Sequence, residues 1–241
     1  MKPFVILQTR PEDIASEGEY ESFLELGNLK NDDLIRVRLD KDEFWKMDLD
    51  SISGIILPGS PFNPGTKTPH EKQKEIEKEL FILLDRVLEA DFPFLSICYG
   101  MGLIGLQAGA KVSEKFGEKL NVIDVNLTDA GKNDKLLKGV KSSFQSIVGH
   151  KVALEDVPGN ATLLATGEKS PIQMLKYKNN IYTTQFHPEL NTESVEVRIK
   201  VYVNHGYFPP HKLEEILEMT RGKDYSHSNK IVENFIQLYH K

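Results

Sequence analysis

The sequence predicts an α/β fold, an open and mostly parallel β-sheet with helices on both faces and a small antiparallel β addition. Two observations lead to this prediction. Between residues 4 and 109, short apolar runs alternate with segments whose apolar residues recur every three or four positions. Between about residues 111 and 185 the pattern changes to a succession of short β segments. Strands that alternate with helices pair in parallel through right-handed crossovers.

The first part of the chain supplies the parallel strands and their helices. Short apolar runs predict strands at residues 4–7, 34–39, 54–57 and 94–97. Apolar residues at helical spacing predict helices at about 14–26 and 76–88, and the second of these is strongly amphipathic. A Gly-rich helix is expected from Cys98 to Ala108, with Gly109 as its cap.

The second part of the chain supplies the remaining β segments and a helical end. Strands are expected at 122–127, 144–148, 162–165, 172–177 and 181–185, and Asn179-Asn180 is a hairpin signal between the last two. Helical patterns return at 195–202, 213–219 and 231–238. Because the chain has no repeat and no low-complexity linker, residues 1–241 are expected to form one domain. Its motifs lie in about 1–190, and about 191–241 form a helical extension.

Composition and charge argue against several kinds of partner and cofactor. The 36 acidic residues outnumber the 30 basic ones, and no basic run carries interleaved aromatic residues, so nucleic acid is not an expected partner. The apolar runs are too short for a signal segment or a membrane span, so a cytoplasmic protein without membrane association is expected. The single cysteine excludes an intramolecular disulfide and a cysteine-based metal site, and neither a metal nor another cofactor is expected.

The strongest local signal surrounds that cysteine. In Phe94-Leu95-Ser96-Ile97-Cys98-Tyr99-Gly100, a buried strand delivers Cys98 into a sharp turn with glycine two positions later. This is the layout of a nucleophile elbow, in which a nearby glycine removes the Cβ clashes that a tight turn would otherwise create. The helix that follows points its free N–H groups toward the sulfur and favours the thiolate. Cys98 is therefore predicted to be a nucleophile rather than a buried structural cysteine.

A base and its orienting group are found in Thr184-Gln185-Phe186-His187-Pro188-Glu189. His187 follows a predicted strand, and Glu189 lies just beyond it. The carboxyl ends of parallel strands share one edge of a sheet, so Cys98 and His187 can meet although they are far apart in the sequence. A cysteine with a base and an acceptor behind that base is a nucleophilic triad, and we predict that Cys98, His187 and Glu189 form one.

The third part of the predicted site is the turn after the strand at 54–57, Pro58-Gly59-Ser60-Pro61. Its backbone can aim N–H groups at a developing oxyanion, and the N–H groups of Ser60 and Tyr99 together would form an oxyanion hole. Taken alone, such a turn is usually an ordinary loop.

These three motifs resemble those of the class I (triad) glutamine amidotransferases, in particular the GMP-synthase-like stand-alone members. Gly59-Ser60-Pro61 stands at the oxyanion turn, Cys98-Tyr99-Gly100 at the elbow and His187-Pro188-Glu189 completes the triad, in the family's order over about residues 1–190. The resemblance implies a flavodoxin-like sheet and hydrolysis of glutamine. Cys98 would attack the side-chain amide, a γ-glutamyl thioester would form, and ammonia would pass to a separate synthetase or acceptor enzyme.

The resemblance also implies which residues line the substrate pocket, namely Gly59, Gly100, Gly102 and His150. His150 falls near a histidine of many relatives, and the alternative is a histidine that closes a loop by hydrogen bonds. Two positions depart from the family's pattern: Gly102 stands where a glutamine commonly holds the substrate's amino-acid end, and Ser60 where a second glycine is usual. Two alternatives therefore stay open, a hydrolase of another γ-glutamyl amide or peptide, and a catalytically silent regulatory or binding module.

The remaining notable residues are expected to serve structure rather than chemistry. A solvated helix face is expected at 71–79 and a turn at 128–131. Phe44 and Trp45 are expected to make a satellite hydrophobic contact, and residues 207–210 a packed corner. Surface positions are expected for four further histidines, His205, His211, His227 and His240.

Overall fold

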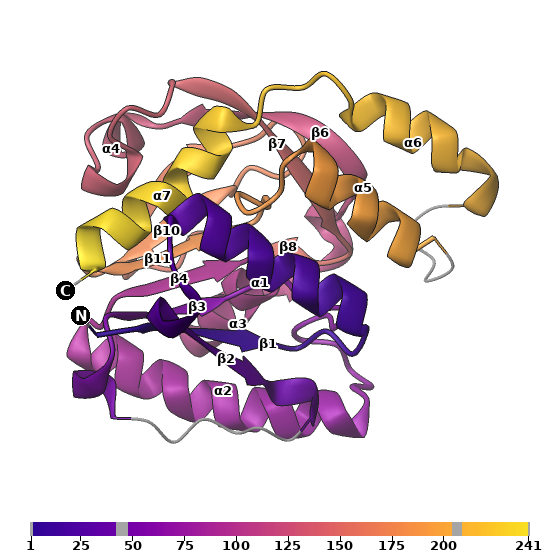
Figure 1. Cartoon of the computed structure of the whole chain (residues 1–241). Helices are drawn as coiled ribbons and strands as arrows, with labels where there is room; N and C mark the ends of the chain where they lie inside the picture. Colours follow the sequence, from indigo (N-terminus) through magenta and orange to yellow (C-terminus); the bar gives the residue numbers. More distant parts are fainter. Residues whose placement is uncertain (1, 42–47, 204–208, 241) are drawn as a thin grey trace.

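The computed structural model describes residues 2–41, 48–203 and 209–240 (Figure 1). Within these residues, one nine-stranded sheet has the order β2-β1-β3-β4-β11-β10-β9-β6-β7. The predictions for Phe44, Trp45, His205, Tyr207 and Phe208 lie outside the described residues.

The parallel part of the sheet is formed by the strands that the first half of the sequence predicts, together with one strand from the second half. In spatial order they are β2 (Leu34–Arg38), β1 (Phe4–Gln8), β3 (Gly54–Leu57), β4 (Phe94–Ile97) and β11 (Ile181–Thr184). All pair in parallel. Every residue of β1, β3, β4 and β11 is buried, as continuous apolar runs covered on both faces should be.

The antiparallel strands continue the same sheet beyond β11. They are β10 (Met174–Tyr177), β9 (Ala161–Thr166), β6 (Glu118–Leu127) and β7 (Ser143–His150). The predicted hairpin between β10 and β11 is confirmed, although Lys178 rather than an asparagine takes the positive φ of 49°. A separate pair, β5 (Val112–Ser113) with β8 (Ala153–Leu154), was not predicted. The predicted antiparallel β addition is confirmed, and it continues the main sheet. We name these four strands the antiparallel wing.

Helices cover both faces of the parallel strands (Figure 1). On one face lie α1 (Asp13–Gly27) and α7 (Ser226–Tyr239), where Phe23 and Phe235 pack with Phe4 of β1. On the other lie α2 (Glu71–Ala90) and α3 (Tyr99–Gln107), where Leu84 packs with Val5. The alternation of Phe4 and Val5 between the two cores follows the period-two geometry of a strand.

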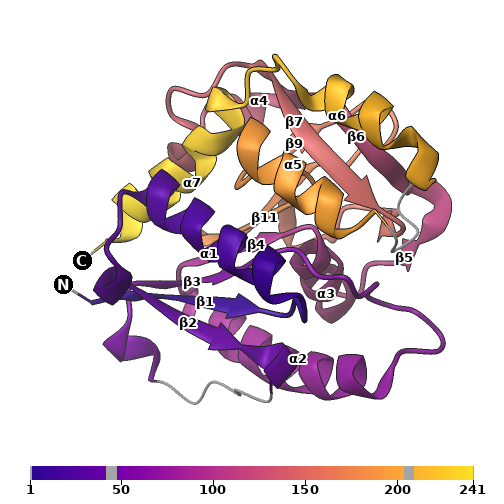
Figure 2. The same cartoon turned by 45° about the vertical axis from the view of Figure 1, so that its right-hand side comes forward.

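Two further helices lie on the antiparallel wing. In Figure 2, α5 (Thr192–Val201) runs between α1 and the strands β6 and β7, with α6 (Leu213–Thr220) beside it. Val195 and Ile199 of α5 form a third apolar cluster with Ile147 of β7. The C-terminal end of α5 also reaches the segment after β1, because the Tyr202 hydroxyl accepts from Arg10 over 3.1 Å. A short helix, α4 (Asp129–Lys132), occupies the segment where the sequence predicts a turn.

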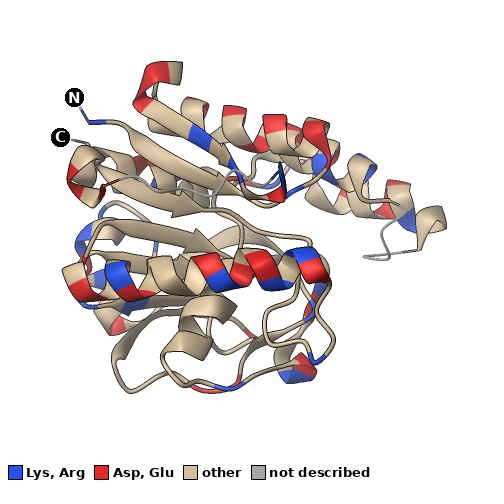
Figure 3. Ribbon diagram, turned by 90° about the horizontal axis from the view of Figure 1, so that it is seen from below, with Lys and Arg blue, Asp and Glu red and all other residues tan. Residues whose placement is uncertain are grey.

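The surface agrees with most of the remaining expectations. Basic and acidic residues are interspersed along α2, which lies in front when the molecule is seen from below (Figure 3), as expected of a solvated helix face. Among the described residues, no helix is both long and apolar enough to cross a bilayer. His240 is placed differently from the prediction. Its ring packs against Phe4 with centroids 5.8 Å apart, and its Nε2 is buried. The reason is that the end of α7 packs on β1.

Candidate active site

The predicted elbow is present between β4 and α3. Cys98 has φ of 52° and ψ of −86°, a backbone conformation that non-glycine residues rarely adopt. Its N–H donates to the Thr184 carbonyl on β11 over 2.6 Å, which ties the turn to the neighbouring strand. Such strain persists where the surroundings enforce it, and here it presents the sulfur at the carboxyl edge of the sheet.

Packing explains the glycine two positions after Cys98. A Cβ added to Gly100 would lie 2.4 Å from the Cβ of Ser96 on β4, so only glycine lets α3 start this close to the strand. Gly100 is not among the residues that line the two cavities beside Cys98. Its role in substrate binding stays a prediction, and the structure shows that it also shapes the elbow.

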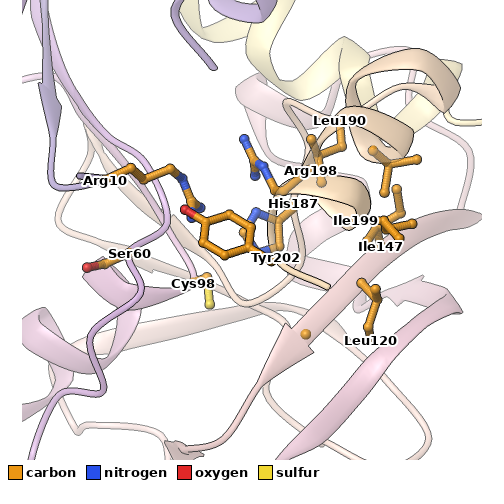
Figure 4. Close-up of a pocket in the computed structure, with 12 residues that line it drawn as sticks. Arg10, Ser60, Cys98, Leu120, Ile147, His187, Leu190, Arg198, Ile199 and Tyr202 are labelled. Atoms are coloured by element: carbon orange, nitrogen blue, oxygen red, sulfur yellow. The ribbon is translucent and has the colours of Figure 1, made fainter. Parts of the chain in front are cut away.

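His187 reaches Cys98 because β11 is the direct neighbour of β4. Thr184 is in register with Ile97, so the segments that follow both strands emerge side by side. The His187 N–H donates to the Ile147 carbonyl over 2.9 Å, and the imidazole Nδ1 contacts Glu189 Oε1 at 2.8 Å. Both side chains are buried, and Figure 4 shows the imidazole beside the sulfur. The structure thus brings the three predicted triad residues together.

The electrostatic surroundings of His187 favour its charged form. Burial opposes that charge, but attraction to Glu189 and hydrogen bonds with Cys98 and Glu189 outweigh it and raise the pKa of His187 to about 9. Burial alone would raise the pKa of Glu189. The positive charges of His187 and Arg198 outweigh this effect and hold that pKa well below its usual range. At neutral pH the pair is therefore a buried imidazolium and carboxylate.

Arg198 is a part of the site that the sequence did not predict. It lies on α5, and its Nη1 donates to Glu189 Oε1 over 2.8 Å, the same oxygen that His187 contacts. The other carboxylate oxygen, Oε2, is buried without a hydrogen-bond partner. The sequence carried only a weak signal for this residue, the capping box of Asn191 and Ser194 that starts α5.

A second buried carboxylate joins this cluster. Glu19 of α1 accepts from Arg10 Nε over 2.7 Å and from Arg198 Nη2 over 3.4 Å, and Arg10 Nη1 also donates to the Tyr202 hydroxyl over 3.1 Å. Arg10 and Glu19 are 4% and 1% exposed, so these charges need each other. Two guanidinium groups and two carboxylates thus balance in charge behind His187.

Gln185 is a further contact that was not predicted. Its side-chain N–H donates to the Cys98 sulfur over 3.7 Å, and the residue is 2% exposed. A donor aimed at sulfur stabilises a thiolate more than a thiol.

Two cavities meet at Cys98. The first, which we name the His187 pocket, has a volume of about 60 Å³ and is lined by residues that include His187, Ile147, Leu190, Val195, Ile199 and Tyr202 (Figure 4). The second, the His150 pocket, has about 20 Å³ and includes Pro64, Tyr99, Gly102 and His150. Ser60, Cys98 and Gly149 line both.

His150 both lines a pocket and closes a loop by hydrogen bonds, so each of its two predicted roles is partly right. It borders the His150 pocket, yet its Nε2 contacts Glu118 Oε2 at 2.9 Å and its Nδ1 contacts the Val152 carbonyl at 3.0 Å. Gln173 donates to the same Glu118 oxygen over 2.9 Å. Because both ring nitrogens already have protein partners, His150 offers a ligand its ring face more readily than a hydrogen bond.

Gly102 borders the His150 pocket, but the space beside it is filled. A Cβ on Gly102 would lie 2.3 Å from Cγ of Pro64, so the proline ring occupies the place into which a side chain here would project. The absence of a side chain at Gly102 therefore does not open an empty subsite.

The turn after β3 borders both cavities through Ser60. A Cβ on Gly59 would be 2.7 Å from Cε1 of His187, so glycine here makes room for the imidazole. The role of Gly59 in substrate binding stays a prediction. The Ser60 hydroxyl accepts from the Phe62 N–H over 3.1 Å and fixes the turn. The roles of the Ser60 and Tyr99 N–H groups in an oxyanion hole stay a prediction. Within the described residues, no group of three or more His, Cys, Asp or Glu side chains could hold a metal ion.

Comparison with known proteins identifies the family. The chain matches the family described as glutamine amidotransferase class-I over residues 29–200. A glutamine-hydrolyzing GMP synthase from Petrotoga mobilis is 29% identical over 143 residues, which are 59% of this chain and 25% of that protein. One subunit of the glutamine-hydrolyzing GMP synthase from Methanocaldococcus jannaschii is 31% identical over 140 residues, 58% of this chain and 65% of that relative. The match thus spans less than two thirds of the length of either relative.

Solved structures share the fold. A glutamine amidotransferase from Thermotoga maritima superposes with a TM-score of 0.77 at 21% identity, over 98% of this chain and 99% of that one. One from Methylobacillus flagellatus gives 0.76 at 16% identity, over 100% and 94%. The α/β fold and the family resemblance read from the three motifs are confirmed. The chain belongs to the class-I glutamine amidotransferase family.

Proposed function

We propose that the protein is a cysteine-dependent amide hydrolase that releases ammonia from the side chain of glutamine. One observation carries the proposal: Cys98 stands in a strained elbow beside a buried His187 whose other ring nitrogen contacts Glu189 at 2.8 Å. Family membership and the names of the relatives support glutamine as the substrate.

The proposed reaction runs through a thioester. The Cys98 thiolate attacks the amide carbon, and the oxyanion accepts from the N–H groups of Ser60 and Tyr99. The C–N bond then breaks while His187 gives its proton to the leaving nitrogen, so that ammonia departs and a γ-glutamyl thioester remains. Water, deprotonated by His187, attacks the thioester, and its C–S bond breaks to give glutamate and the free cysteine. A His187 pKa of about 9 suits the first half, because the imidazolium already holds the proton that the nitrogen needs.

Glu189 and Arg198 are proposed to position the base. Glu189 fixes the imidazole through Nδ1, and Arg198 holds Glu189 through the same oxygen. Because neither touches the reacting atoms, we regard both as positioning residues. Gln185 is proposed to steady the thiolate before attack.

The ammonia is proposed to serve a separate acceptor enzyme in the cytoplasm. The support is the M. jannaschii relative, which is named as one subunit of GMP synthase. A second candidate is hydrolysis of another γ-glutamyl amide or peptide, and it is kept because Gly102 departs from the glutamine that is common in the family.

The test is ammonia release from L-glutamine by the full chain, with Cys98→Ser as the control. We expect turnover that the control lacks. If the wild-type protein releases no ammonia although iodoacetamide alkylates Cys98 rapidly at pH 7, the glutaminase proposal is wrong and the second candidate gains. If no ammonia is released and Cys98 instead reacts no faster than a free thiol of pKa about 8.5, the protein is a catalytically silent module.

A further inference from the structure

The His187 pocket and the His150 pocket divide the surroundings of the nucleophile into two sides. Both contain Cys98, but His187 borders only the first, and Tyr99, Gly102 and His150 border only the second. The two substituents of an amide carbonyl placed over the sulfur then point to different sides, one toward each cavity.

The proton transfer decides which substituent enters which cavity. The leaving nitrogen must take a proton from His187, so it must lie on the side that His187 borders. The acyl part, bonded to the same carbon, then extends toward Tyr99 and Gly102. The His187 pocket is thus the space that surrounds the leaving nitrogen and whatever is attached to it.

The walls of the His187 pocket are mostly apolar. Leu120, Ile147, Leu190, Val195 and Ile199 contribute them, and all except Leu120 are at most 2% exposed. The charged groups at its margin already have partners, because Arg198 binds Glu189 and Glu19, and Arg10 binds Glu19 and Tyr202. The pocket therefore offers little to a charged group and favours an apolar one.

The volume limits the size of that group. At about 60 Å³ the His187 pocket is larger than the His150 pocket, at about 20 Å³. This is more space than an ammonia nitrogen fills, since about 10–15 Å³ of such space already holds one water molecule. The groups that suit it are short, such as an alkyl chain of about two carbons.

Building on the proposed amide hydrolysis, we infer that the His187 pocket binds a short alkyl group on the amide nitrogen, so that the protein hydrolyses γ-glutamyl N-alkylamides. Cys98 attacks the amide carbon, the C–N bond breaks, and the nitrogen leaves as the alkylamine with the proton of His187. Water then hydrolyses the thioester, so that amide and water give glutamate and the alkylamine.

The first test compares kcat/KM for L-glutamine, γ-L-glutamyl-methylamide, -ethylamide and -butylamide, with γ-glutamylglycine as a charged leaving group. Each buried methylene should raise kcat/KM by about fourfold as far as the ethylamide. The butylamide should then fall, and γ-glutamylglycine should be the poorest. If glutamine is hydrolysed and every alkylamide is slower, this inference is wrong while the proposed function stands. If no compound is hydrolysed, the proposed function itself fails.

A matched pair of variants on α5 tests the pocket directly. Val195 lines it and is 1% exposed, whereas Val197, on the same helix, is 43% exposed and lies outside it. Val195→Ala should raise the ratio of butylamide to ethylamide kcat/KM severalfold, and Val197→Ala should leave it unchanged. Leu120→Phe, at a less buried position, should lower that ratio and serves if Val195→Ala folds poorly. Equal ratios in wild type, Val195→Ala and Leu120→Phe would overturn the inference.

Discussion

The two sides of the candidate active site are built in different ways. The nucleophile side, residues 94–107, is one continuous strand, turn and helix, and its geometry depends on neighbours such as Cys98 and Gly100. The base side is assembled from separate segments. Arg198 of α5 donates to Glu189, and the same arginine also donates to Glu19 of α1. Substitution of Cys98 should therefore remove chemistry alone, whereas substitution of the residues that hold Glu189 should also change the pH dependence of the rate and the stability of the fold.

The largest effect is expected for Cys98→Ser. A serine hydroxyl beside the same histidine is far less ionised than a thiol, so hydrolysis should fall by at least about 10³-fold. The fold should be retained, because the two side chains differ by one atom. Ammonia release and circular dichroism check the two parts, and turnover close to wild type would reject Cys98 as the nucleophile.

The next largest losses of activity are expected for His187 and Glu189 on the base side. His187→Ala should reduce kcat/KM by about 10³-fold or more, because the proton carrier is lost. Glu189→Gln should cost less, since the amide can still accept from Nδ1, although it no longer stabilises the imidazolium. Single-turnover rates at several pH values distinguish the two. A greater loss for Glu189→Gln than for His187→Ala would mean that their roles are assigned wrongly.

The sequence predicted the nucleophile side more completely than the base side, for a physical reason. A strand that runs into a Cys-x-Gly turn is a local pattern, so Cys98 and its elbow could be predicted from neighbouring residues alone. The contact of Arg198 with Glu189 depends on where α5 packs, which local spacing does not specify. The same limit applies to Gly102, whose neighbour Pro64 lies in a distant loop, and to β6 and β7, whose attachment to the main sheet requires long-range pairing.

Arg198→Met should have an intermediate effect on both stability and rate. Breaking a buried ion pair costs about 3–5 kcal/mol, and the loss here should lie at the lower end because Glu189 keeps His187 and Glu19 keeps Arg10. Loss of the positive charge should also raise the pKa of His187 above about 9. The alkaline limb of the plot of kcat against pH should then move to higher pH. Arg198→Lys should restore part of the rate. A loss of stability without a shift of this limb would mean that Arg198 serves only packing.

Arg221→Met is the matched control for Arg198→Met. Arg221 contacts Glu196 of α5 at 2.9 Å but is 46% exposed, whereas the side chain of Arg198 is 14% exposed. An exposed pair contributes about 0–1 kcal/mol. We expect the control to lower Tm slightly and to leave the pH profile unchanged, since it touches neither Glu189 nor His187.

The raised pKa of His187 predicts a smaller, pH-dependent effect on stability. The folded value of about 9 exceeds the ordinary value of 6.5, so the folded protein binds the proton more tightly. This contribution is complete below about pH 6.5 and is lost as the pH rises through about 9. Urea unfolding at pH 6, 7.5 and 9.5 should show a free energy of unfolding that declines more steeply for the wild type than for His187→Gln. Parallel curves would contradict the raised pKa.

A small effect is also expected on the nucleophile side, at Gly102. Gly102→Gln introduces the residue common in the family, and glutamine is the better helix former by up to about 1 kcal/mol. Its Cβ, however, would lie 2.3 Å from Pro64, and overpacking of this kind costs about 1–3 kcal/mol. The single variant should therefore be slightly less stable and slower on glutamine. Adding Pro64→Ala should remove the clash and bring glutamine kcat/KM to the wild-type value or above it, because the new amide can then reach the His150 pocket. If the single variant is as stable as the wild type and the second substitution changes nothing, the loop that carries Pro64 moves aside without cost, and the proline does not determine what the pocket accepts.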